Sequence, residues 1–113
     1  MSAARVFILH PEDLLVNFDY NGKQAHNAVE AFHILENDQD FDKYLLENDL
    51  GSEEPKSQGV HILEWALNNN FINHYAAIKL LTWNPVARQR MIDLLEAEGF
   101  HYTIFHDWRK NVN

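Results

Sequence analysis

Three side chains that could do chemistry follow predicted strands of this 113-residue chain. Glu47 and Asp49 come directly after the apolar residues 43–46, and Thr82 comes directly after the apolar residues 75–81. In open α/β sheets, ligands collect where the strands end at their carboxyl edge. Carboxylates suit a hard cation, and a hydroxyl can contact a phosphoryl group. Asp49, Glu47 and Thr82 are therefore the candidate catalytic residues.

A second acidic pair follows the first predicted strand, residues 5–9. If the strands are parallel neighbours, Glu12 or Asp13 meets Glu47 and Asp49 at the same edge of the sheet. Such a cluster of oxygen ligands suits Mg²⁺, and a phosphate could then bridge to the metal. These four carboxylates are the candidate metal ligands.

The last predicted helix opens with a recognisable start signal. Asn84 suits the N-cap and Pro85 suits the first helical position. Backbone amides and the dipole at this helix N-terminus favour a phosphate, and Arg88 lies in the first turn. Trp83 is the aromatic side chain that we expect to be most exposed. Asn84, Arg88 and Trp83 are the candidate ligand-binding residues, although for Asn84 a helix cap alone explains the residue.

The elements that must position these residues alternate between strands and helices. We expect strands at 5–9, 14–20, 43–46, 75–81 and 100–105, and helices at 24–36, 60–70 and 85–99. Too few residues separate the first two strands for a helical crossover, so that pair is antiparallel or one irregular strand. Residues 52–59 form an exposed loop that could act as a lid, and residues 106–110 fray. The order predicts one α/β domain over residues 1–113, with a mostly parallel, five-stranded sheet and about three helices.

Composition excludes several classes of function. The chain has no cysteine, so disulfides, thiolate nucleophiles and cysteine-bound zinc are absent. The formal net charge of −8 disfavours direct binding to nucleic acid, which normally needs a basic face. The chain has neither a signal-like N-terminus nor an apolar stretch long enough to cross a bilayer, so we expect a cytoplasmic protein without a membrane partner.

Three motifs together resemble the cyclic-phosphate-processing receiver-like domains, whose fold is receiver-like, or flavodoxin-like. They are Glu47-Asn48-Asp49-Leu50-Gly51, the helix opening at Gly59, and Thr82-Trp83-Asn84-Pro85 with its following helix. The family pattern has an acidic pair after the first strand, an Asp-His-Asp-Leu-Gly run and a His-Ser-x-Asn-Pro run. Asp49, Leu50, Gly51, Asn84 and Pro85 match it.

Both motif histidines are replaced in this sequence. Asn48 and Leu81 stand at their positions, Glu47 replaces the first Asp of its run, and Thr82 replaces Ser. A hydrolase of this kind would need an acid or base near the leaving oxygen, for which His10 or His106 could substitute if the ends of their strands meet. As a phosphoacceptor, Asp49 would be the nucleophile and Thr82 its hydroxyl partner, but only Lys110 lies downstream to supply a cation.

Three functions remain open. The leading hypothesis is a divergent receiver-like domain that binds a phosphate-bearing small molecule or a protein partner, with weak or absent catalysis. The second is a metal-dependent hydrolase of cyclic phosphates that uses Glu47, Asp49 and Thr82. The third is a small acidic inhibitor or adaptor that binds a protein through residues 52–59 and Trp83.

Overall fold

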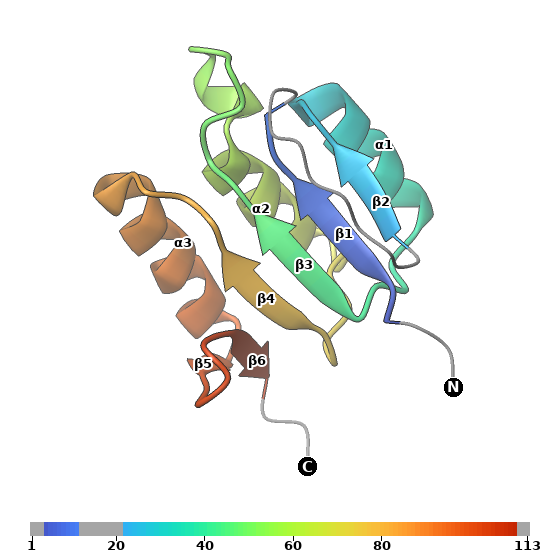
Figure 1. Ribbon diagram of the computed structural model, residues 1–113, viewed down its shortest axis with the longest axis vertical. Helices are drawn as coiled ribbons and strands as arrows, with labels where there is room; N and C mark the ends of the chain where they lie inside the picture. Colours follow the sequence, from blue (N-terminus) through green and yellow to red (C-terminus); the bar gives the residue numbers. More distant parts are fainter. Residues whose placement is uncertain (1–3, 12–21, 111–113) are drawn as a thin grey trace.

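The fold is built on one sheet of six strands, in a computed structural model that describes residues 4–11 and 22–110. The strand order is β2-β1-β3-β4-β6-β5 (Figure 1). Neighbouring strands from β2 to β4 are parallel, whereas β6 is antiparallel to both β4 and β5. Hence β6 alone runs against the others. In chain order the strands are Val6–Leu9 (β1), Gly22–Ala25 (β2), Lys43–Leu46 (β3), Ala77–Leu80 (β4), Phe100–Tyr102 (β5) and Trp108–Lys110 (β6).

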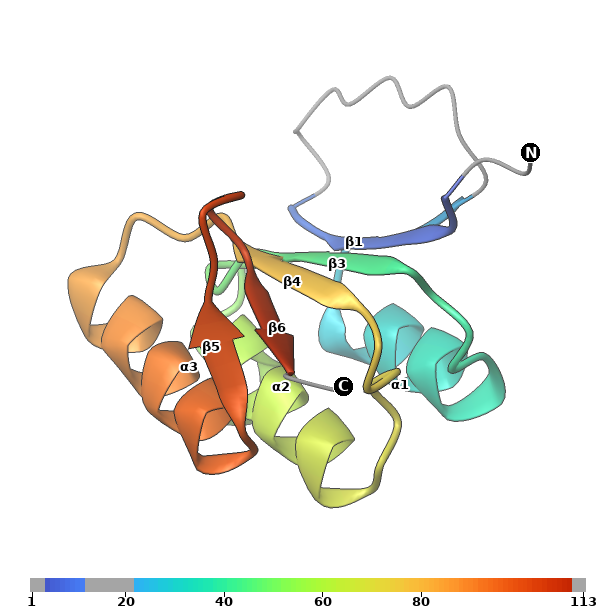
Figure 2. The ribbon, with the colours of Figure 1, turned by 90° about the horizontal axis from the view of Figure 1, so that it is seen from below.

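The three α-helices of the described residues cover the same face of this sheet, as Figure 2 shows. Their bounds are Ala28–Asn37 (α1), Gly59–Asn68 (α2) and Pro85–Ala97 (α3), and a short 3₁₀ helix, η1, spans Pro55–Ser57. In parallel strands, successive side chains point to opposite faces. Phe7, Tyr44 and Ile78 point toward the helices, where they are fully buried with Leu63 of α2 and Met91 of α3. The core therefore lies between the sheet and one helical layer.

The start of the first helix differs from the prediction. Residues 24 and 25, assigned to a helix by their apolar spacing, belong to β2, and α1 begins only at Ala28. Asn27 Oδ1 accepts the Glu30 amide at 2.9 Å, and Glu30 Oε1 accepts the His26 amide at 2.8 Å. This reciprocal arrangement is a variant of the capping box, and its Asn-x-x-Glu spacing was present in the sequence. It also turns Val29 outward, where 78% of its surface is exposed.

The strand count was also too low. The tail predicted to fray forms β6, which inserts between β4 and β5 as the second strand of an antiparallel hairpin. β2 is a strand where the sequence predicted the start of a helix, while the predicted strand at 14–20 lies outside the described residues. Both ends of the third helix were predicted correctly: Asn84 caps it, Pro85 is its first residue, and Gly99 has φ +93° just beyond it. No helix of the described residues has the length and apolarity needed to span a membrane.

Candidate functional site

The ends of the three central strands lie side by side at the carboxyl edge of the sheet. The Glu47 amide donates to Leu9 O at 2.9 Å, and the Leu81 amide donates to Leu46 O at 2.7 Å. These hydrogen bonds continue the parallel pairing one residue beyond each strand. They place the loop that starts at Glu47 between His10 and Thr82. The edge predicted to hold the functional residues therefore does bring these segments together.

The acidic loop after β3 uses one of its carboxylates to hold its own backbone. Glu47 Oε1 accepts the amides of Asn48 and Asp49, at 2.9 and 3.4 Å. Asp49 is exposed, and its Oδ1 accepts only a long hydrogen bond of 3.3 Å from the Asn48 side chain. Gly51, at φ +83°, then turns the chain toward η1. Glu47 is thus partly occupied with structure, whereas Asp49 keeps a carboxylate facing solvent.

Asn48 anchors this loop to the start of α2. Only 1% of its surface is exposed; its Oδ1 accepts the Val60 amide at 3.0 Å, and its backbone oxygen accepts the Gly59 amide at 2.9 Å. A Cβ on Gly59 would lie 2.0 Å from Glu47 O and 2.8 Å from Asn48 Cα. Glycine is required here because two backbones touch. In the sequence Asn48 stands out only as the replacement for a motif histidine, and its role in holding the start of α2 has no local signal.

The loop between β4 and α3 is organised by two short polar side chains. Thr82 is buried, and its Oγ1 accepts the Asn84 amide at 3.1 Å. Asn84 Oδ1 accepts the amides of Val86 and Ala87 at 3.1 and 3.2 Å. The expectation that these amides await a phosphate is therefore wrong in this structure, because the cap already satisfies them. The Thr82 hydroxyl proton still has no acceptor among the described residues.

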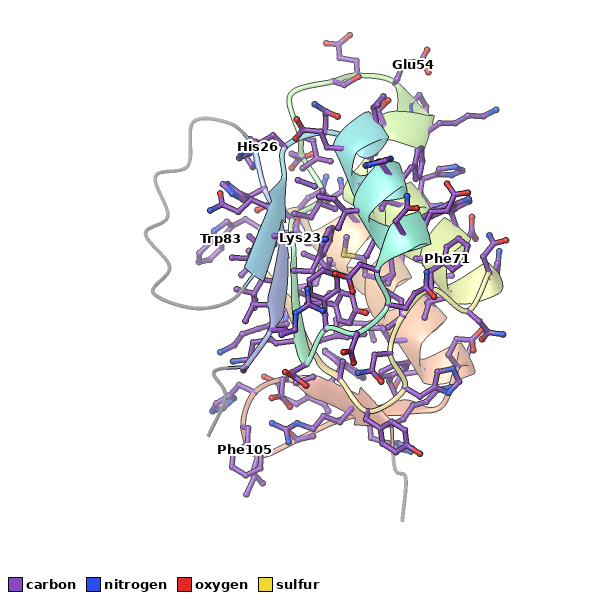
Figure 3. The ribbon with its side chains drawn as sticks, turned by 90° about the vertical axis from the view of Figure 1, so that its right-hand side faces the viewer. Lys23, His26, Glu54, Phe71, Trp83 and Phe105 are labelled. Atoms are coloured by element: carbon purple, nitrogen blue, oxygen red, sulfur yellow. The ribbon has the colours of Figure 1, made fainter. Side chains whose placement is uncertain are left out.

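An open groove of about 370 Å³ lies where this loop meets the sheet, lined by Leu80, Leu81, Thr82, Trp83, Pro85 and Arg88. Trp83 is 94% exposed, which confirms the expectation from its position in the motif loop. Its side chain lies on the side of the sheet away from the helices (Figure 3). Arg88 Nη1 donates to Leu80 O at 3.2 Å, which fixes the guanidinium at the groove and leaves its other N–H groups free of described partners. The groove therefore offers an aromatic face and a cation.

Only two of the four predicted metal ligands lie in the described residues. Glu47 and Asp49 lie in one loop, whereas Glu12 and Asp13 lie outside the described residues. Within residues 4–11 and 22–110, no group of three histidine or acidic side chains could hold a metal ion. Two carboxylates still fit Mg²⁺, which commonly takes one or two from the protein and completes its shell with water and phosphate. The free oxygens of Glu47 and Asp49 are the atoms that would hold it.

His10 ends β1 at the same edge but is deeply buried, with 1% of its surface exposed. Its Nε2 lies 2.9 Å from Gln24 Oε1, its ring packs edge-on against His26, and its Nδ1 has no partner among the described residues. His106 lies in the β5–β6 hairpin at φ +61°. Figure 3 shows its neighbour Phe105 near the opposite end of the molecule from His26. The two strand-end histidines considered as substitutes therefore do not meet.

Lys110 is equally remote from the acidic loop. It belongs to β6, which runs against β4 from the pair Trp108 and Ile78, so Lys110 lies toward the amino end of the sheet. There its ammonium group is 3.3 Å from His74 Nδ1 and 5.6 Å from the centre of the Phe100 ring. This cation cannot accompany Asp49 in phosphotransfer, as the sequence indicated.

Comparisons with known proteins agree with this architecture. Residues 12–97, more than half of the chain, match the cyclic-phosphate processing receiver domain family. No curated protein matches the sequence. One similar solved chain carries the yeast Spc42 trimeric coiled coil, amino acids 181–211, fused to another structure, with a TM-score of 0.58 and 15% identity. The similarity covers 83% of this chain and 63% of that one, and at this identity it supports the fold alone.

Proposed function

We propose, because this chain belongs to the family of cyclic-phosphate processing receiver domains, that it binds a phosphate-bearing small molecule with weak or absent catalysis. The observation that carries this proposal is the groove at the end of β4, where a fixed Arg88 guanidinium lies beside a Trp83 ring that is 94% exposed. Tryptophan is a common anchor in binding sites.

Arg88 and Trp83 would contact different parts of such a ligand. Arginine presents several N–H groups in a plane that matches phosphate oxygens, and Arg88 has only one of them engaged with Leu80 O. Trp83 supplies a flat apolar face on which a base can stack. A phosphate attached to an aromatic base, as in a cyclic or linear nucleotide, would use both contacts. The Thr82 hydroxyl could add a hydrogen bond at the floor of the groove.

Weak catalysis is proposed because the acid–base machinery is incomplete. Asn48, at the position of one motif histidine, is buried and committed to capping α2, and Leu81 carries no proton. His10 lies at the correct edge, but its ring is buried under neighbouring residues. A general acid must reach the leaving oxygen within about 3 Å. None of the described histidines is placed in the groove.

Thermal unfolding with ligands tests the proposal. The panel is inorganic phosphate, a 2′,3′-cyclic nucleotide, a 3′,5′-cyclic nucleotide and a linear nucleotide, each with and without Mg²⁺. A ligand of the folded state raises stability by mass action, and roughly 1 kcal/mol shifts the melting temperature by about 4 °C in a domain of this size. We expect a shift with a nucleotide that is lost in Arg88→Gln and reduced in Trp83→Ala.

Arg90→Gln is the matched control, because Arg90 lies on the same helix but lines a different cavity with Glu64 and Asp93. It should keep the full shift. If no ligand of the panel shifts the wild-type protein, or if Arg90→Gln loses the shift as completely as Arg88→Gln does, the groove is not the binding site.

A second candidate function is metal-dependent hydrolysis of cyclic phosphates. It is favoured by the family to which the chain belongs and by the placement of Glu47 and Asp49 in one loop at the carboxyl edge. A divalent cation would supply Lewis-acid activation there, while the two carboxylates would fix its position. Turnover of a cyclic nucleotide with Mg²⁺ or Mn²⁺ that disappears in Asp49→Asn supports this function, and absence of turnover with both metals rejects it.

A further inference from the structure

The face of the sheet opposite the helices carries cations in a protein whose net charge is −8. Tyr44, Leu46, Ile78 and Leu80 belong to the core on the helical side. Side chains alternate along a strand, so Lys43 and Leu45 of β3, and Ala77 and Lys79 of β4, lie on the other face. None of the described helices covers that face (Figure 2). Trp108 also faces the core, which places its neighbours Asp107 and Arg109 on the open side.

Strand register puts these cations around one small residue. Lys43 pairs with Ala77 across β3 and β4, and Leu45 pairs with Lys79. Continuing the antiparallel register from Ile78 and Trp108 sets Arg109 on the other side of Ala77. Lys43 and Arg109 therefore lie two strand spacings apart, about 10 Å, with only a methyl group between them. Ala77 itself is buried, with 6% of its surface exposed, so a bound carboxylate would contact the cations around it. We call Lys43, Ala77, Lys79, Asp107, Arg109 and Phe105 the basic sheet face, on which three cations outnumber one carboxylate.

Arg109 is held in place rather than free to swing. Its Nε and Nη2 donate to the two oxygens of Asp107, each at 3.0 Å, and its guanidinium lies 5.0 Å from the centre of the Phe105 ring. Burial alone would raise the pKa of Asp107, but hydrogen bonds from Arg109 and Thr103 outweigh it and keep the pKa below its ordinary value. Lys43 contributes to the same lowering. Lys43 and Lys79 form no ion pair with a described residue.

The hairpin between β5 and β6 adds an apolar side to this face. Asp107 accepts the Thr103 hydroxyl at 2.6 Å, and Thr103 Oγ1 accepts the Phe105 amide at 3.1 Å. These bonds make a stiff turn whose tip presents Ile104 and Phe105, which are 87% and 62% exposed. The hairpin lies beyond residues 12–97, the part that matches the receiver family. A rigid tip with exposed apolar residues is a feature of protein interfaces.

We propose that the basic sheet face binds an acidic segment of another protein, with carboxylates against Lys43 and Lys79 and apolar side chains against the hairpin tip. Charge complementarity selects an acidic occupant. A protein rather than a nucleic acid is selected because the strand positions between the cations hold Leu45 and Ala77, and the ring of Phe105 already packs against the Arg109 guanidinium. The net charge of −8 also repels a polyanion more than a short acidic segment. No residue of the basic sheet face lines the groove at Arg88.

An NMR titration of the ¹⁵N-labelled protein tests the inference with three probes: a short synthetic peptide that alternates Glu and Phe with Ser, the same peptide with Lys in place of Glu, and oligouridylate. We expect the acidic peptide to shift the amides of Lys43, Ala77, Lys79 and Arg109. Lys79→Glu should weaken its binding about fivefold or more, since like charges then face each other. Phe105→Ser should weaken it without changing the net charge.

Lys56→Glu is the matched control, because Lys56 is exposed on η1 and the substitution makes the same change in net charge. It should leave the affinity within about twofold. Arg88→Gln should also leave it unchanged, which separates this surface from the proposed ligand groove. Equal binding of the lysine peptide, preference for oligouridylate, absence of binding, or equal weakening by Lys56→Glu would each overturn the inference.

Discussion

The charged side chains at the two ends of the parallel sheet differ in how many of them are paired. At the amino end, Arg5 donates to both oxygens of Asp38, at 3.1 and 2.7 Å, and Lys23 lies 3.2 Å from the same carboxylate. At the carboxyl end, Asp49 and Trp83 face solvent, and Arg88 keeps most of its N–H groups free of described partners. At the amino end the charged side chains are paired with one another, whereas at the carboxyl end they remain free to contact a ligand.

This difference separates residues that hold the fold from residues that can bind. A paired, partly buried carboxylate contributes to stability, while an exposed and unpaired one contributes little. We therefore expect substitutions at the amino end to lower stability, and substitutions at the carboxyl end to alter binding. The junction of Asn48 and Gly59 is the exception, because it lies at the carboxyl end yet is fully engaged.

The largest effect is expected at this exception. In Gly59→Ala, the new Cβ would lie 2.0 Å from Glu47 O, so the acidic loop and the start of α2 must separate. Overpacking against backbone should lower the free energy of unfolding by about 3 kcal/mol or prevent folding. Urea denaturation measures it. Gly51→Ala is the control: it has open space but φ +83°, and should cost only about 1 kcal/mol.

A smaller and pH-dependent effect is expected at the amino end. The hydrogen bond from Arg5 is the main cause that holds the pKa of Asp38 well below its ordinary value. A carboxylate with a lowered folded-state pKa stabilises the protein above its unfolded pKa, about 3.9, and loses this contribution as the pH falls below that value. Asp38→Asn should therefore cost between about 1 and 2 kcal/mol at neutral pH and progressively less in acid.

Urea denaturation at several pH values, with Glu36→Gln as the control, checks this prediction. Glu36 is exposed on α1, so its substitution should change stability little at any pH. A cost of Asp38→Asn that is the same in acid and at neutral pH would show that the ion pair with Arg5 is not its source.

The helix cap in the motif loop should give an effect of about 1 kcal/mol. Asn84→Ala removes the acceptor for the Val86 and Ala87 amides, and the loss of a cap typically costs this much. Asn84→Asp keeps the acceptor and should retain stability. Thermal unfolding compares the two. Because the two amides are then unpaired at a helix N-terminus, Asn84→Ala should also bind inorganic phosphate at least as well as wild type, whereas weaker binding would give Asn84 a direct role in recognition.

Sequence patterns predicted the parts of this fold whose signals are local. The apolar runs at β1, β3 and β4, the cap and first proline of α3, and the glycine that ends it each depend on neighbouring residues. The misses depend on distant ones. β6 forms because Trp108 pairs with Ile78, thirty positions earlier, and Asn48 is buried because Gly59 lets α2 approach it. Long-range pairing and backbone contact leave no periodic signal in a sequence.

The same distinction explains the candidate site. Which segments meet at the carboxyl edge follows from parallel topology, and the sequence predicted it. Which polar atoms remain available does not, because it depends on hydrogen bonds made after folding. Glu47 and Asn84 are residue types that commonly bind ligands. In this structure, however, a side-chain oxygen of each already accepts a hydrogen bond from a nearby backbone amide. Trp83 and Arg88 were also candidates in the sequence and are the more available groups in the structure.

The smallest effect on stability is expected for the exposed carboxylate of the acidic loop. Asp49→Asn loses only a long contact with Asn48, so the free energy of unfolding should change by less than about 0.5 kcal/mol. Its effect on binding separates the two proposed functions. If the groove binds phosphate through Arg88 alone, the nucleotide-induced shift in melting temperature survives Asp49→Asn both with and without Mg²⁺. If a metal at Glu47 and Asp49 takes part, the portion of the shift that requires Mg²⁺ disappears while the protein stays folded. A large loss of stability would instead place Asp49 with Asn48 and Gly59, among the groups that hold the loop, and would break the division between the two ends of the sheet.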